Sequence, residues 1–187
     1  MKRRLLISAL LVISLFFLSW MATIEKEIKY KMKDVPSFCS FAKNLEYPTT
    51  SLNTINETIT ELQSHDAVCD SKALLYVDYG FMVGIYPLIA LLLFQLLTVY
   101  DKSKYKYFKT LAYLQIIPFI ADIAENIILH KSLDAGQLVV GISLYHIIEY
   151  CKWGISILGG VVILIASLIW MFNFLISFWK SRENVSY

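Results

Sequence analysis

The sequence carries little charge for its length. Of its 187 residues only 17% are charged, whereas an ordinary soluble domain carries roughly 25%. The formal net charge of +2 excludes the large basic surface that nucleic-acid binding requires. Three cysteines are too few for a disulfide scaffold. With 57% apolar residues and a mean hydropathy of +0.58, the chain is neither an ordinary soluble domain nor a disordered one.

The sequence also lacks the short motifs that carry common chemistries. It contains no phosphate-binding glycine loop, no H-E-x-x-H, no C-x-x-C and no recognisable Ser/His/Asp signature. His146 and Glu149 are spaced to share one helical face, and Asp122, Glu125 and His130 are further ligand types for a metal. Because no paired metal-binding motif accompanies them, we expect ordinary hydrogen bonds there, with no metal and no cofactor.

Long apolar runs dominate what is present. They cover about residues 5–22, 73–100, 107–129 and 154–178, and a helix needs about 20 apolar residues to cross a bilayer. We therefore predict an all-α membrane protein, a bundle of four transmembrane helices forming one domain over residues 1–187. The last apolar stretch extends over residues 138–179, so we expect residues 138–153 to prolong the fourth helix on one side of the membrane.

Basic residues predict the orientation of the bundle. Nine of them flank the spans on one side: Lys2, Arg3, Arg4, Lys102, Lys104, Lys106, Lys109, Lys180 and Arg182. The positive-inside rule places this side, with both termini, in the cytoplasm, in a bacterial inner membrane or a plasma membrane. Four lysines at 26, 29, 31 and 33 compete with this assignment. We expect the first span to stay uncleaved, because cleavage after Ala22 would place bulky Trp20 where a small residue is needed.

The outer loop, residues 23–72, is expected to be partly helical. Residues 49–51 offer helix-capping hydroxyls, and apolar residues then recur at helical spacing at Leu52, Ile55, Ile59 and Leu62. Cys39 and Cys69 also lie in this loop. In an oxidising compartment they would form a disulfide, which would close a loop of roughly 30 residues and contribute about 3–4 kcal/mol.

Polar residues inside the third span form the most informative pattern. Gln115, Asp122, Glu125 and Asn126 share one face of an otherwise apolar helix. A charged side chain at the bilayer centre costs about 2.5–3.5 kcal/mol on insertion scales, so these groups are expected to face the bundle interior. Pro118 lies one turn earlier and removes a backbone hydrogen bond, which allows a bend there.

The natural partners of these carboxylates lie in the other spans. Lys152 and Glu149 share a polar stripe with His146 in the fourth span, and Asp78 opens the second span. At 1.5 Å per residue, Asp78, Glu149 and Lys152 lie with Asp122 and Glu125 in the outer half of the membrane or at its outer rim. Gly80 and Gly84 follow Asp78 and allow another helix to approach closely.

Two short motifs suggest a resemblance. Asp122-Ile123-Ala124-Glu125-Asn126 in the third span and Lys152-Trp153 in the fourth resemble a group of small bacterial four-helix membrane proteins without assigned activity. The resemblance covers the last three spans and implies a shared fold, but no chemistry.

The sequence favours a non-enzymatic membrane component that binds a partner or small ligand. Its candidate binding residues are Asp78, Asp122, Glu125, Asn126, His146, Glu149 and Lys152; its partners would be membrane lipids and other membrane subunits or a second copy. For Asp122, Glu125, Asn126 and Lys152, a purely structural knot of salt bridges and hydrogen bonds between helices is an equal interpretation. The alternatives are an intramembrane enzyme on a lipid or isoprenoid, with Asp122 and Glu125 as acid and base, and an oligomeric channel or proton-coupled carrier. A closed, paired cluster would favour binding, and an apolar cavity reaching the carboxylates would favour an enzyme.

Overall fold

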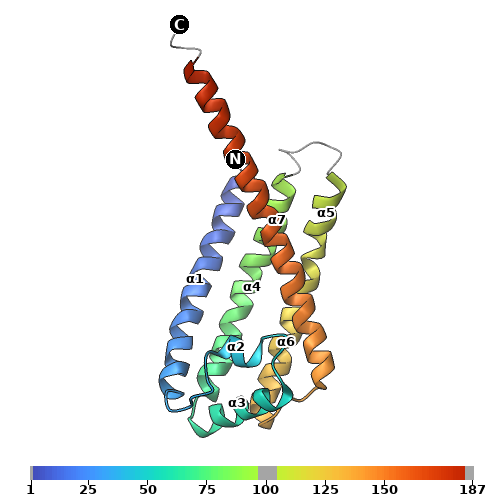
Figure 1. Cartoon of the computed structure of the whole chain (residues 1–187). Helices are drawn as coiled ribbons and strands as arrows, with labels where there is room; N and C mark the ends of the chain where they lie inside the picture. The colour runs from blue at the N-terminus through green and yellow to red at the C-terminus, as the bar shows by residue number, and fades with distance from the viewer. Residues whose placement is uncertain (1, 97–104, 184–187) are drawn as a thin grey trace.

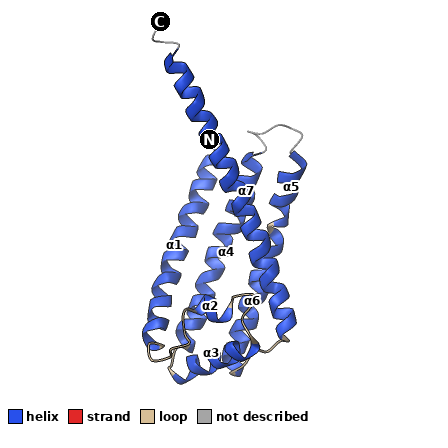
Figure 2. Cartoon of the chain, viewed as in Figure 1, coloured by secondary structure: helices blue, strands red, loops and turns tan. Residues whose placement is uncertain are grey.

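The structure, a computed structural model, describes residues 2–96 and 105–183. Within these residues the chain forms seven helices and no strand (Figure 2). They are α1 (Lys2–Lys31), α2 (Phe41–Leu45), α3 (Leu52–Ser64), α4 (Val68–Leu96), α5 (Tyr105–Leu114), α6 (Ile116–Ala135) and α7 (Ile142–Glu183). The predicted residues 97–100 of the second span, and Lys102 and Lys104 of the following loop, lie outside the described part.

Four segments are long and apolar enough to cross a membrane. They are Arg3–Lys31, Val68–Leu96, Lys106–Ala135 and Ile142–Asn173, and they run side by side (Figure 1). The prediction of an all-α, four-helix membrane bundle is therefore confirmed. We call the end where α1 begins and α7 ends the terminal end, and the opposite end, which carries α2 and α3, the cap end (Figure 1).

Close packing of α1 on α4 depends on two glycines. A Cβ atom at Gly80 would lie 2.3 Å from the ring of Phe17, and one at Gly84 would lie 2.5 Å from the hydroxyl of Ser14. Such distances are far inside van der Waals contact, so only glycine allows α1 to approach this closely. The predicted role of this glycine pair is confirmed.

The third span is broken between α5 and α6. Pro118 has no N–H to donate to the preceding turn, and the helix stops at Leu114 and restarts at Ile116. Gln115, at the break, is buried and its Nε2 donates to the backbone oxygen of Ile155 in α7 at 3.4 Å. A Cβ at Gly159 would lie 2.7 Å from that amide, so Gly159 provides the room for Gln115 against α7.

The last apolar stretch forms one helix, but it starts later than predicted. Gly136 adopts a left-handed conformation with φ of 74° and ends α6. Residues 138–141 then belong to the connection, and α7 begins at Ile142. The expected extension of the fourth span is thus helical only from residue 142.

Residues 32–67 form a cap segment over one end of the bundle. The segment is shorter than the predicted loop of residues 23–72, because α1 continues to Lys31 through residues with good helix propensity. The predicted amphipathic helix is α3: Ser51 accepts a hydrogen bond from the Thr54 amide at its start. Its residues Ile55, Ile59 and Leu62 are fully buried, and only Leu52 of the predicted apolar set is exposed.

The predicted disulfide between Cys39 and Cys69 is wrong, since both thiols are free and exposed. The two cysteines are fixed at different heights along α1. Phe41, beside Cys39, donates its amide to Glu25, whereas Asp70, beside Cys69, pairs with Lys31. Six helical residues separate these anchors by about 9 Å, and a disulfide requires Cα atoms about 4.4–6.8 Å apart.

Candidate functional site

Lys152 of α7 lies at the centre of a buried ionic cluster. Its Nζ atom contacts the carboxylate of Glu125, lies 3.2 Å from Oδ1 of Asp122 and lies 3.5 Å from Oε2 of Glu46. Lys152 is 7% exposed, Asp122 is 3% exposed and Glu125 is completely buried. An isolated charge buried in this way would be very costly, so the groups stabilise one another only as a set.

The local sequence explains why these side chains meet. Asp122 and Glu125 lie one turn apart on α6, on the face that packs against α7. Lys152 projects from the facing turn of α7. Glu46 follows α2 directly, so the cap segment adds a third element to the cluster. The structure thus joins α6, α7 and the cap segment through one ammonium group.

A second carboxylate on α7 extends the cluster. The indole N–H of Trp153 donates to Oε2 of Glu149 at 3.1 Å and to the backbone oxygen of Glu46 at 3.2 Å. The carboxyl group of Glu149 lies beside that of Glu125. Both residues are fully buried, and in the described structure the Oε1 atom of each has no hydrogen-bond partner. Carboxyl groups therefore outnumber ammonium groups in this interior.

Tyr86 of α4 connects the cluster to an apolar groove. Its hydroxyl donates to Oδ2 of Asp122 at 2.7 Å. Its ring lines a groove of about 290 Å³ between α4 and the α5–α6 break, together with Pro87 and Phe119. Neither Asp122 nor Glu125 is among the lining residues of that groove. The hydroxyl of Tyr86 thus stands between this groove and the carboxylate of Asp122.

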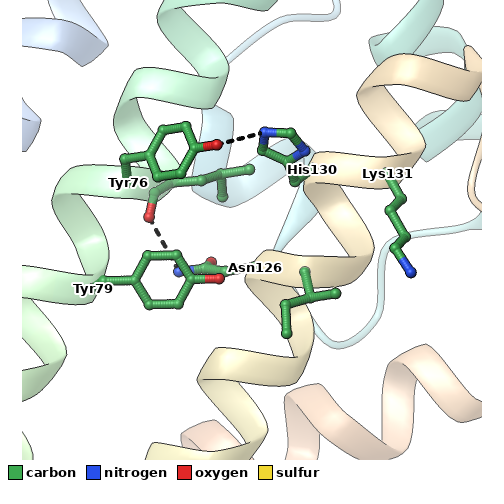
Figure 3. A pocket seen from close by; sticks show the side chains of 7 residues that line it. Tyr76, Tyr79, Asn126, His130 and Lys131 are labelled. Carbon is green, nitrogen blue, oxygen red and sulfur yellow. Dashed lines mark hydrogen bonds between the residues drawn. The ribbon is translucent and has the colours of Figure 1, made fainter.

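Asp78 and Asn126 form a separate pair beside the cluster. Nδ2 of Asn126 donates to Oδ2 of Asp78 at 2.8 Å and to the backbone oxygen of Leu75 at 3.4 Å. Asn126 also lines a small cavity of about 170 Å³ between α4 and α6. Figure 3 shows Tyr76 and His130 at the same cavity, with the Tyr76 hydroxyl 3.2 Å from Nε2 of His130. This cavity is small, and Tyr76, His130 and Asn126 in its wall are already hydrogen-bonded.

His146, another predicted site residue, does not join the cluster. Its Nε2 donates to the backbone oxygen of Thr50 at 2.9 Å, and the neighbouring Tyr145 hydroxyl donates to the backbone oxygen of Leu45 at 2.8 Å. Both acceptors belong to the cap segment. Together with Lys152 and Trp153, these two residues give α7 four polar contacts to residues 45–50, and we call this set the α7 clamp.

Sequence reasoning missed two participants. Glu46 lies in a segment where an acidic residue is usually solvated, and Tyr86 looks like an interfacial aromatic. Their roles depend on tertiary packing, and the only signal for Glu46 was the excess of carboxylates over lysines near Lys152. The predicted residues Asp122, Glu125, Glu149 and Lys152 do come together.

Comparisons with protein-family models, with curated proteins and with solved structures found no match for this chain. The site is therefore interpreted from its geometry alone.

Proposed function

We propose that this chain is a small non-enzymatic membrane component that binds another membrane subunit at its cap end. The observation that carries the proposal is the α7 clamp, in which Tyr145, His146, Lys152 and Trp153 bond α7 to the cap segment. An intramembrane enzyme would need its acid and base open to a substrate, and Asp122 and Glu125 are closed off by Lys152, Tyr86 and Glu46. The arrangement is suited to holding the cap segment in a fixed position against α7.

The surface presented at the cap end supports this proposal. On α7, Leu144, Ile147 and Tyr150 are each more than half exposed and follow one another at intervals of three residues. These three residues lie closer to the cap end than Lys152, which contacts Glu46. Glu46 directly follows α2, and Phe41 at the start of α2 bonds to Glu25 of α1. This part of α7 therefore lies at about the level of Glu25. Around Glu25, α1 has already become charged, with Lys26 and Lys29 exposed. An apolar stripe at a level where another helix of the bundle is charged is typical of a protein contact.

The proposal includes the orientation of the chain in the membrane and its relation to other membrane proteins. The basic residues at the terminal end support a cytoplasmic location for both termini, which would place the cap segment on the outer side. We also propose kinship with the small bacterial four-helix proteins that the D-x-x-E-N and Lys-Trp motifs resemble; Asp122, Glu125 and Lys152 of these motifs meet in the buried cluster.

A photocrosslinking experiment tests the proposed contact. A photoreactive phenylalanine analogue replaces Ile147, and in a matched control it replaces Leu164 on the same helix; both residues are 59% exposed. In native membranes we expect a discrete protein adduct from position 147 and none from position 164. An adduct of twice the chain's mass would identify the partner as a second copy. The absence of a protein adduct at 147, or the same adducts at both positions, would refute the proposal.

A second candidate function is a proton-coupled carrier. The observation that favours it is the pair of buried carboxyl groups of Glu125 and Glu149, whose Oε1 atoms have no partner in the described structure. Adjacent buried carboxylates repel each other, and a proton between them relieves that repulsion. Proton flux into liposomes that contain the wild type, but not into liposomes with Glu149→Gln, would support this function over the first.

A further inference from the structure

A groove at the terminal end is lined by α1, α4 and α7. It has a volume of about 580 Å³, within the range of typical ligand pockets, about 300–1,000 Å³. Its wall is mainly apolar and includes Leu92, Leu96, Ile163 and Met171; Arg4 of α1 and Gln95 of α4 also line it. The groove therefore combines an apolar wall with a cation.

The packing of the helices explains why the groove exists. α1 packs along α4, and α7 pairs with α6, which separates α1 from α7. At the cap end, α2 bridges this separation through Phe41, bonded to Glu25 of α1, and through Glu46, bonded to Lys152 of α7. At the terminal end the same separation forms the open groove. Ala166 and Ser167 on α7 have small side chains, which leaves space on this side of the groove.

The surroundings of the groove determine what fills it. It lies between apolar helices that are long enough to cross a membrane. Trp170 in its wall and Leu168 beside it on α7 are about half exposed. Apolar side chains at that depth meet hydrocarbon rather than water. The tail of a lipid fits such a wall.

The basic residues at the terminal end of the groove determine which class of lipid it binds. Arg3 donates from Nη2 to the backbone oxygen of Leu91 at 3.2 Å, which fixes the start of α1 against α4 and keeps Arg4 beside the groove. The sequence has no acidic residue in segments 1–24, 79–100 and 150–182, so the parts of α1, α4 and α7 that line the groove carry no carboxylate. A phosphate group without a balancing ammonium matches this charge.

We propose that this groove binds one anionic phospholipid, with an acyl chain along α4 and α7 and the headgroup phosphate paired with Arg4 and Arg3. The site lies at the opposite end from the cap segment and is independent of the partner contact proposed above.

Native mass spectrometry of the detergent-purified protein tests this site. Phosphatidylglycerol and phosphatidylcholine with identical acyl chains are titrated separately, and we expect one tightly held phosphatidylglycerol per chain. Arg4→Gln should weaken phosphatidylglycerol binding about fivefold, which corresponds to about 1 kcal/mol per basic residue near an anionic lipid, and should leave phosphatidylcholine binding unchanged. Lys106→Gln, an exposed basic residue on α5, is the matched control and should bind like the wild type.

A second pair of variants tests the groove itself. Ser167→Trp places a large side chain in the groove and should abolish the bound lipid, whereas Leu168→Trp, beside it on the helix surface, should retain it. The proposal is overturned if the two lipids bind equally to the wild type, if Lys106→Gln weakens binding as much as Arg4→Gln, or if Ser167→Trp binds lipid as tightly as Leu168→Trp.

Discussion

Replacement of Lys152 by methionine tests the energetics of the buried cluster. Methionine keeps the apolar stem and removes the ammonium group, which leaves Glu125 and Asp122 buried without their counter-charge. Breaking a buried ion pair from one side costs about 3–5 kcal/mol. For a chain of this size each kcal/mol shifts the melting temperature by about 2–4 °C, so we expect Lys152→Met to melt on the order of 10 °C lower.

The neutral triple variant separates the charge from the packing. Lys152→Met combined with Glu125→Gln and Asp122→Asn neutralises the two carboxylates that contact Lys152 most closely, and neutral replacements of buried ion pairs are often tolerated. The triple variant should therefore recover most of the stability lost by Lys152→Met alone. Glu46→Gln should cost under about 1 kcal/mol, because Glu46 is part-exposed and its contact with Lys152 is long.

Thermal unfolding followed by circular dichroism in one detergent measures these differences. Lys131→Met serves as the control, since Lys131 is exposed on α6 and should change stability by no more than about 0.5 kcal/mol. The reasoning is refuted if Lys152→Met melts together with Lys131→Met. It is also refuted if the triple variant is no more stable than the single one, because the loss would then come from packing.

Three further predictions concern the helices and the cap segment. Gly84→Val should separate α1 from α4, because its added atoms would collide with Ser14; a cysteine crosslink engineered between the two helices should then form more slowly than in the wild type. Ser51→Ala should lower the free energy of unfolding by about 1 kcal/mol through loss of the hydrogen bond at the start of α3, measured by the same melts. Cys39 and Cys69 should both react with a maleimide in the folded protein, and replacing both by serine should leave the melting temperature unchanged; mobility that changes with reductant would contradict this.

The sequence predicts the membrane bundle well because its signals are local and long. Apolar runs, the glycine pair on α4 and the spacing of Ile55, Ile59 and Leu62 each report on one helix and one face. The polar faces of α6 and α7 likewise predict that Asp122, Glu125 and Lys152 turn inward, since a lipid-facing charge is costly.

The sequence fails where structure depends on contacts between distant segments. The five residues of α2 are too few to produce a periodic pattern, so neither this helix nor the bond from Glu46 to Lys152 was predictable. The disulfide was predicted from the number and compartment of the cysteines alone. That prediction is wrong because Phe41 and Asp70, near the two cysteines, bond to Glu25 and Lys31 at different heights on α1. These contacts exist only in the folded chain.

The central claim is that the α7 clamp fastens residues 41–50 to the bundle. Hydrogen–deuterium exchange of Tyr145→Phe combined with His146→Ala, which removes the clamp bonds to Leu45 and Thr50, tests this claim most directly when compared with the wild type. We predict faster exchange in residues 41–50, with unchanged exchange in α3, because α3 is held separately by the bond from Gln63 to the backbone oxygen of Leu133. Equal protection of residues 41–50 in both proteins, with the bundle folded, would contradict the account.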